Sequence, residues 1–134
     1  MTKQLTFGKD ERLKSRKRIE QLFSEGKSFA ISSFKVFYKL DKLTRSPLQL
    51  GVGVNARYFK KSVNRNRIKR LIKESWRLQK NELKEKLHDS SKELGVFLIF
   101  TGKDLPEYNF VKEKLTIILN KLLKLVDEDN TTNT

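Results

Sequence analysis

The sequence predicts a single α+β domain in which helices pack mostly on one side of a small sheet. Three observations favour this class. A chain of 134 residues, 37% of them hydrophobic, suffices for one modest core. Apolar residues alternate along residues 48–54 and form an uninterrupted run at residues 96–100, and both patterns are typical of strands. Helical apolar spacing occurs before, between and after these segments.

The residue pattern of the N-terminal third predicts one short helix followed by an extended stretch. Ser15 is suited to cap a helix from Arg16 to Glu25, and Gly26 is suited to end it. Residues 28–40 are expected to be extended, with aromatic rings on both faces. One face has Phe34, Val36 and Tyr38, and the other has Lys35, Phe37 and Lys39. Residues 1–8 are expected to be a mobile arm.

The middle of the chain predicts a turn at residues 45–47, a strand at residues 48–54 and a long helix from Ser62 to Leu87. Placing the helix residues at 100° intervals separates two faces. The apolar face has Ile68, Leu71, Ile72 and Ser75, and the opposite face has the basic residues Arg65, Lys69, Arg70, Lys73 and Arg77. Because a long helix separates strand 48–54 from strand 96–100, a crossover unit with parallel strands is expected.

The C-terminal part predicts a last helix from Glu107 to Val126, preceded by Asp104 as a capping partner of Glu107. Residues 127–134 are polar and are expected to be a disordered tail. The predicted domain therefore spans residues 1–126, in the order helix, two or three strands, long helix, strand, helix.

The positive charge of the chain is concentrated in its middle. Thirty Lys and Arg residues against sixteen Asp and Glu residues give a formal net charge of +14. Residues 42–73 carry ten basic residues and no acidic one, whereas residues 74–134 carry ten basic and eleven acidic residues. A surface that serves solubility alone would mix both signs. The distribution indicates a face that binds a polyanion, nucleic acid in the first place and an anionic membrane surface in the second.

Several classes of chemistry are excluded by composition. Without cysteine there is no disulfide framework, thiolate zinc site or cysteine nucleophile, and the single histidine, His88, excludes a mechanism that needs two imidazoles. The acidic residues are scattered, so no carboxylate cluster for two-metal hydrolysis is expected. The longest apolar run, residues 96–100, is too short to span a bilayer, and the first residues have no apolar signal segment. We therefore expect a cytoplasmic protein with no membrane partner.

The segment 57–77 carries the most specific chemistry. Arg65 and Arg67 flank Asn66 in the first turns of the predicted long helix, where free N–H groups and a partial positive charge favour phosphate. Guanidinium groups add bidentate donors. Lys60 and Lys61 precede the helix, so several cations converge where they would suit a folded RNA. A basic helix alone would equally fit a DNA-binding basic helix or a calmodulin target.

Residues 62–74, SVNRNRIKRLIKE, are similar to the RNR signature of the bacterial ribonuclease P protein component. RLKS, LFSEGKSF, VFYKL and LGVGV elsewhere in the chain also resemble this family, and the resemblance covers nearly the whole sequence. Ser62 stands where the family often has alanine, and Ile19 where some relatives carry an aromatic residue. The resemblance implies the family's α-β-β-β-α-β-α sandwich, a ribosomal protein S5 domain 2-like fold. It also implies a left-handed βαβ crossover, against the usual right-handed rule.

The resemblance also implies a function. The protein would be a subunit of ribonuclease P, a ribonucleoprotein endoribonuclease that removes the 5′ leader from precursor tRNA. The catalytic RNA subunit would bind Mg²⁺ and perform the chemistry, so the protein alone would be non-catalytic, would hold no cofactor or metal, and would be monomeric without RNA. Its partners would be the catalytic RNA subunit and precursor tRNA.

The resemblance assigns two sets of site residues. The set for the RNA subunit is Arg57, Lys60, Lys61, Asn64, Arg65, Asn66, Arg67, Lys69, Arg70 and Lys73. The set for the leader is Arg12, Lys14, Arg16, Phe23, Phe34, Val36 and Tyr38. Aromatic side chains on a strand face are suited to stack unpaired bases, at about 1–3 kcal/mol per base. Phe34 and Val36 fit a packed core under a helix equally well.

A second function stays open from the sequence. A structural RNA-binding protein of the ribosomal type would show the same charge pattern and would have no role in tRNA processing. Adding the protein to the catalytic RNA at low Mg²⁺ separates the two, because only a ribonuclease P subunit would stimulate leader cleavage. A protein of the membrane surface would need an exposed apolar face on the basic helix, and that face is expected to cover the sheet.

Overall fold

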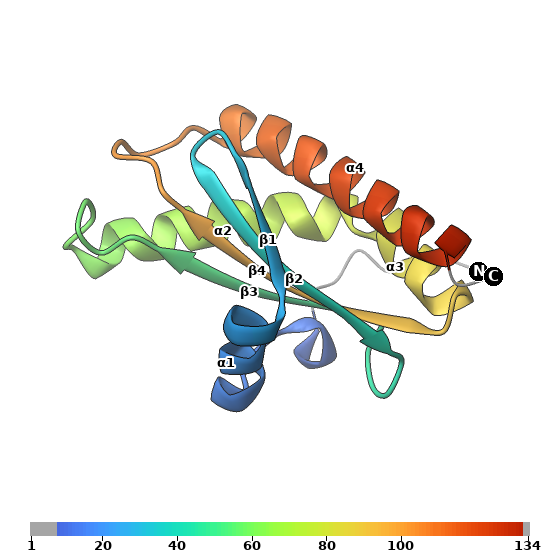
Figure 1. Cartoon of the computed structure of the whole chain (residues 1–134). Helices are drawn as coiled ribbons and strands as arrows, with labels where there is room; N and C mark the ends of the chain where they lie inside the picture. The colour runs from blue at the N-terminus through green and yellow to red at the C-terminus, as the bar shows by residue number, and fades with distance from the viewer. Residues whose placement is uncertain (1–7, 133–134) are drawn as a thin grey trace.

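The structure is a computed structural model that describes residues 8–132, and the side chains of residues 8–130. A short 3₁₀ helix, η1 (Lys9–Glu11), precedes α1 (Arg16–Glu25); three strands, two helices, one strand and a last helix follow (Figure 1). The further elements are β1 (Lys27–Ile31), β2 (Phe34–Lys42), β3 (Leu48–Val54), α2 (Ser62–Gln79), α3 (Asn81–Asp89), β4 (Lys92–Phe100) and α4 (Tyr108–Thr132). The predicted α+β class is confirmed.

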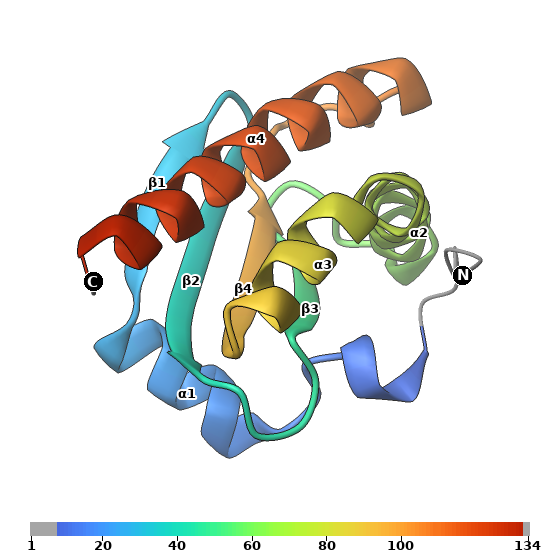
Figure 2. The same ribbon diagram turned by 90° about the vertical axis from the view of Figure 1, so that its right-hand side faces the viewer.

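The four strands form one sheet in the order β1-β2-β4-β3. β2 pairs antiparallel with β1 and with β4, whereas β3 and β4 are parallel neighbours joined through α2 and α3. The predicted crossover unit is therefore present. In Figure 2, α3 lies in front of β3 and β4, both strands rise, and β4 lies to the left of β3. The crossover is thus left-handed, as the resemblance implies and against the common rule.

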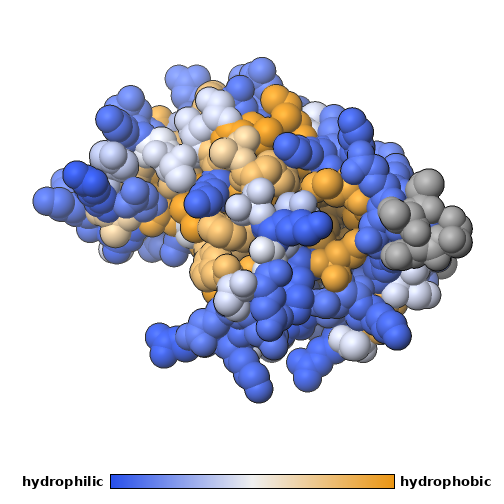
Figure 3. All heavy atoms as spheres, in the orientation of Figure 1, coloured by the Kyte–Doolittle hydropathy of each residue, from blue (hydrophilic) through white to orange (hydrophobic). Residues whose placement is uncertain are grey.

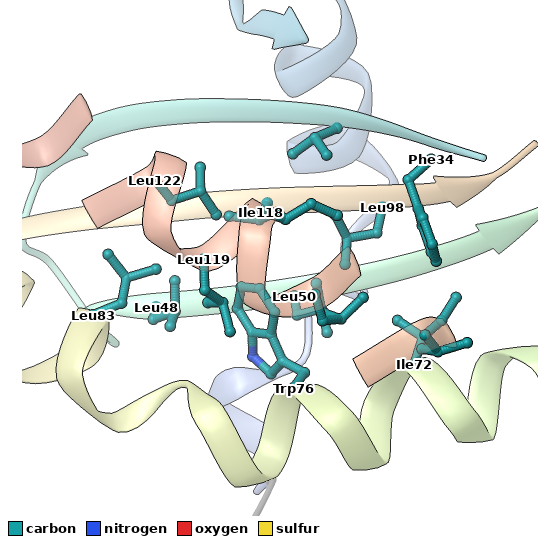
Figure 4. Packing of buried hydrophobic residues seen from close by; sticks show 14 of the residues in the cluster. Phe34, Leu48, Leu50, Ile72, Trp76, Leu83, Leu98, Ile118, Leu119 and Leu122 are labelled. Carbon is teal, nitrogen blue, oxygen red and sulfur yellow. The ribbon is translucent and has the colours of Figure 1, made fainter. Parts of the chain in front are cut away.

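One face of the sheet carries the core, because α2, α3 and α4 cover it (Figure 2). Trp76 of α2 is fully buried and lies among leucines of β3 and α4 (Figure 4). In β2 the alternate residues Phe34 and Val36 point into this core. Among the described residues, only α1 and the segment around η1 lie on the opposite face, and they leave part of it uncovered.

The expected extended stretch 28–40 is a hairpin. It turns at residues 32–33, where Ser33 has a φ of 67°, a conformation that serine rarely adopts. The expected strand 96–100 also begins earlier, at Lys92, because its first residues pair with the end of β2.

The long helix predicted from Ser62 to Leu87 is two helices. α2 ends at Gln79 and α3 begins at Asn81, with Lys80 between them. Lys80 is only 1% exposed and forms an ion pair with Glu11. The break lets a charged side chain at this position reach its partner while Leu83 remains in the core.

The prediction of a disordered tail at residues 127–134 is wrong for the residues that the structure describes, since α4 continues to Thr132. Lys86 donates to Asp127 at 2.5 Å, Lys92 pairs with Asp129, and Asn130 donates to Ser90 at 2.8 Å. Polar residues thus continue the helix because α3 and β4 supply their partners. Residues 133–134 lie outside the described part, as do residues 1–7 of the predicted arm.

Candidate nucleic-acid interface

The exposed side of α2 forms a basic hollow with a volume of about 470 Å³. One turn after another contributes a polar or cationic side chain, because basic residues recur at helical spacing. The hollow is lined by Arg12, Asn66, Lys69, Arg70, Lys73, Glu74 and Arg77. Four of the residues predicted to bind the RNA subunit therefore share one concave surface, and Arg12, predicted for the leader, joins them.

Positive charges crowd in this hollow. Burial lowers the pKa of Lys73, and the charges of Arg12, Lys69 and Lys14 lower it further. The neighbouring positive charges therefore disfavour the charged form of Lys73. A bound polyanion would relieve this repulsion. This arrangement is suited to phosphate groups that lie close together.

The N-terminal segment is fastened so that Arg12 faces α2. Arg12 forms a β-bridge with Leu50, and the N–H of Leu13 donates to the Leu50 carbonyl at 2.9 Å. Just before it, the buried carboxylate of Glu11 pairs with Lys80 and with Lys84. These contacts explain how a residue far from the RNR segment in sequence becomes part of the same surface.

Glu11 interacts strongly with the ammonium groups of Lys80 and Lys84. Burial alone would raise the pKa of Glu11, but hydrogen bonds from Lys80 and Lys84 and their charges outweigh it, and the pKa falls below its ordinary value of 4.5. Burial also lowers the pKa of Lys80, although Glu11 opposes this effect. Glu11 is therefore held as a carboxylate between two ammonium groups.

The arginines of the RNR segment lie at the start of α2 in different roles. Arg65 is half-buried, and its Nη1 donates to the carbonyls of Phe59 and Lys60 at 2.8 and 2.7 Å. Arg65 thus orders the loop that leads into the helix, while Arg67 is exposed. Within residues 8–132, neither arginine forms an ion pair with a carboxylate. Arg57, Lys60 and Lys61 are exposed in the preceding loop, and Asn64 is half-buried.

The open face of the sheet carries three phenylalanines in edge-to-face contact. The ring centroid of Phe23, on α1, lies 4.7 Å from that of Phe37 on β2 and 5.2 Å from that of Phe97 on β4. Lys35 Nζ lies 5.1 Å from the Phe37 centroid. We call Phe23, Phe37 and Phe97 the aromatic cluster. Phe23 is 43% exposed, so the cluster offers ring surface to a ligand.

Two glycines of β3 make room for this cluster. A Cβ atom on Gly51 would lie 2.5 Å from the Phe97 ring, and one on Gly53 would lie 3.1 Å from it. The Phe97 ring therefore lies over the face of β3 that has glycines in place of side chains. The space-filling view shows apolar surface gathered in the middle of the molecule, with hydrophilic side chains around it (Figure 3).

The prediction that Phe34 and Val36 line a leader cleft is wrong. They are 1% and 0% exposed and belong to the core beneath the helices, as Figure 4 shows for Phe34. Tyr38 lies on the same side of β2, half-buried against the core and beside the ring of Phe29. Burial and the nearby charge of Glu128 raise the pKa of Tyr38. Successive strand residues face opposite ways, so the open face belongs to the alternate set, Lys35 and Phe37.

The other leader residues are placed differently. Phe23 lies in the aromatic cluster. Arg16 is exposed in the first turn of α1, and Lys14 is exposed just before it. Phe37 and Phe97 were not among the residues predicted for the leader. The sequence feature that could have indicated Phe97 is the pair Gly51 and Gly53, because these residues without side chains leave room on β3 for its ring.

The described residues contain no group of three or more His, Cys, Asp or Glu side chains that could hold a metal ion. Within residues 8–132, no helix combines the length and the apolar character needed to cross a membrane. His88 is exposed near the end of α3, beside Asp89.

Comparison with known proteins gives consistent matches. The model of the ribonuclease P family matches residues 7–123. The ribonuclease P protein component of Porphyromonas gingivalis (strain ATCC 33277) is 33% identical over 118 residues, which cover 86% of each chain. That of Bacillus cereus (strain Q1) is 34% identical over 110 residues, 82% of this chain and 87% of the relative.

Solved structures agree with these matches. The RNase P protein from Thermotoga maritima is 26% identical, with a TM-score of 0.63 over 83% of this chain and 96% of that one. The Staphylococcus aureus RNase P protein at 2.0 Å is similar in fold, with 21% identity and a TM-score of 0.60 over 82% of this chain and 93% of that one.

Proposed function

The chain belongs to the ribonuclease P protein family, and we propose that it binds the catalytic RNA subunit of ribonuclease P and the 5′ leader of precursor tRNA. It would assist removal of the leader, which leaves the mature 5′ end of the tRNA. The Mg²⁺ ions and the hydrolytic chemistry would belong to the RNA. We further propose that the protein is monomeric without RNA and acts in the cytoplasm.

The basic hollow along α2 is the observation that carries this proposal. It combines guanidinium and ammonium groups with the amide of Asn66 on one concave surface. Guanidinium forks and ammonium groups bind phosphate oxygens through charge-assisted hydrogen bonds. A folded RNA, where phosphates crowd together, is the polyanion that such a surface fits. Arg67, exposed at the start of the same helix, would extend the contact.

The aromatic cluster is the proposed contact for the leader. Its rings face out from the open side of the sheet, next to Lys35. Unpaired bases stack on such rings regardless of sequence, at about 1–3 kcal/mol per base, and a neighbouring ammonium group binds the backbone. Arg12 and Lys14 lie on the path between this face and α2. The protein would thus hold the leader beside the catalytic RNA and offset the repulsion between their phosphates.

Reconstitution tests the proposal. The protein is added to catalytic RNA at low Mg²⁺, and cleavage of precursor tRNA is measured with and without it. Stimulated cleavage is expected. Binding of RNA without stimulation would instead favour a structural RNA-binding protein of the ribosomal type.

A double variant, Arg67→Ala with Lys69→Ala, locates the contact. Because these side chains do not form the core, folding is expected to survive while assembly with the RNA weakens. Lys124→Ala, an exposed cation of α4 on another side of the molecule, serves as the control. Equal behaviour of the two proteins would contradict the assignment of the hollow.

A further inference from the structure

The loops that follow the parallel strands β3 and β4 leave the same end of the sheet (Figure 1). Val54 and Phe100 are paired at the ends of the two strands, and the N–H of Asn55 donates to the Phe100 carbonyl at 3.3 Å. The β3–α2 loop comprises residues 55–61, and the β4–α4 loop comprises residues 101–107. The two loops therefore start side by side, although they are far apart in the sequence.

Tyr58 is an exposed aromatic residue on a loop whose backbone is held in place. The residue itself is 40% exposed, while its neighbour Phe59 belongs to the core. The N–H of Arg57 donates to Asn55 Oδ1 at 2.9 Å, and the N–H of Tyr58 donates to the Asn55 carbonyl at 3.3 Å. Arg65 binds two carbonyls of the same loop. The ring is thus preorganised on the surface, which lowers the entropy lost when a ligand binds.

Lys103, on the other loop, lies against this ring. Its Nζ is 5.7 Å from the ring centroid of Tyr58. The residue before it, Gly102, packs closely on the end of β4, since a Cβ atom there would lie 2.5 Å from the Phe100 ring. The side chain of Lys103 is exposed, so the ring and the ammonium group form one surface patch to which two loops contribute.

The surroundings of the ring are cationic. Four exposed side chains of the two loops carry this charge: Arg57, Lys60, Lys61 and Lys103. Within residues 8–132, none of the four forms an ion pair with a carboxylate, and this includes Asp104, the exposed neighbour of Lys103. An exposed ring beside cations without carboxylate partners is the combination that binds a nucleobase together with the phosphates next to it.

We propose, resting on the proposed function, that the ring of Tyr58 stacks on an unpaired base of the catalytic RNA subunit. The phosphates on either side of this base would contact Lys60 and Lys61. The RNA subunit is the source because the loop leads directly into α2, whereas the proposed leader contact lies on the open face of the sheet. The base would belong to a bulge, a loop or a helix end, because bases stacked inside a duplex have no free face. The hollow along α2 would bind the RNA backbone, and Tyr58 would fix which unpaired position lies beside it.

Filter binding tests this contact by measuring the affinity of the catalytic RNA for the natural chain and for variants over a range of salt concentrations. Tyr58→Ala is expected to weaken binding about tenfold and to leave the log–log salt slope unchanged, because a stacked ring releases no counterions. Tyr58→Phe keeps the ring and should bind as the natural chain does. Tyr58→Leu keeps apolar bulk without a ring and should bind like Tyr58→Ala. Leu105→Ala, which removes a side chain that is 44% exposed in the β4–α4 loop, is the matched control and should change neither the affinity nor the slope.

The outcomes separate the two proposals. If the natural chain does not bind the catalytic RNA, the proposed function fails, and this inference fails with it. If it binds but Tyr58→Ala binds equally well, or Tyr58→Leu binds as tightly as Tyr58→Phe, RNA binding stands and the stacking contact is overturned. An equal loss in Leu105→Ala would overturn it too, because burial of any apolar side chain would then explain the effect. The same variants are titrated with unpaired oligocytidine, whose affinity should not change; a loss there alone would assign Tyr58 to the leader and contradict the RNA subunit as its partner.

Discussion

Removing the Glu11 carboxylate tests how the N-terminal segment is fastened. In Glu11→Ala the ammonium of Lys80, which is 1% exposed, loses its ion pair with the buried carboxylate, while Lys84 is partly exposed and regains water. Breaking a buried ion pair by removing one member costs about 3–5 kcal/mol, because the other charge stays buried. A domain of this size is stable by about 5–15 kcal/mol, so the loss is a large share of the total.

Urea unfolding measures this loss directly. The single tryptophan, Trp76, is fully buried and reports the core by fluorescence. The double variant Glu11→Leu with Lys80→Met replaces both charges by apolar groups, and it should recover most of the free energy of unfolding. A loss below about 1 kcal/mol in Glu11→Ala would refute the reasoning, as would a double variant no more stable than the single one.

Four further predictions follow from the contacts described. Since the folded pKa of Glu11 is depressed, its contribution to stability is present above pH 4.5 and is lost as the pH falls through the folded value; acid titration of unfolding should show this slope, and Glu11→Gln should flatten it. Phe97→Ala should weaken binding of an unpaired leader by about 1–3 kcal/mol and leave mature tRNA unaffected, which gel-shift titrations with both RNAs would reveal. Gly51→Val should destabilise the fold, since its Cβ would lie 2.5 Å from the Phe97 ring, whereas Gly95→Ala, with open space around it, should not; thermal unfolding compares them. Lys73→Gln should reduce the salt dependence of RNA binding by about one unit of log–log slope, measured by filter binding between low and moderate salt.

The sequence predicted the parts of the fold that rest on a single repeating pattern. The period of 3.6 residues along 62–77 placed Ile68 and Ile72 in the core and Lys69 and Lys73 outside it, as observed. The uninterrupted apolar run at 96–100 predicted a covered strand, and it lies inside the sheet between β2 and β3. The same pattern predicted that the basic residues of the RNR segment lie outside the core, and they do.

The face of β2 could not be predicted in the same way. Both sides of this strand carry aromatic rings, so the alternation does not say which set the helices cover. A shift of the strand by one residue would exchange its two sides. In the structure, Phe34 and Val36 lie in the core and Phe37 lies on the open face. The deciding information lies in other strands, where Phe97 needs the space above Gly51 and Gly53.

Contacts between segments that are distant in the chain could not be predicted from the sequence either. The pairing of Glu11 with Lys80 links positions 69 residues apart, and it coincides with the break between α2 and α3. Likewise, Asp127 and Asp129 in the last turns of α4 pair with Lys86 and Lys92, which lie far from them in sequence. The sequence gives the number of charged residues, but which of them form ion pairs depends on the three-dimensional structure.

Arg12 is the place where these observations meet. The segment that carries it is held on one side by the β-bridge to Leu50 and on the other by the buried carboxylate of Glu11. It lines the basic hollow along α2, and its charge lowers the pKa of Lys73. These contacts therefore hold together cations that repel one another. A polyanion bound in this hollow would relieve the repulsion, so its binding and the stability of the N-terminal segment would be thermodynamically linked.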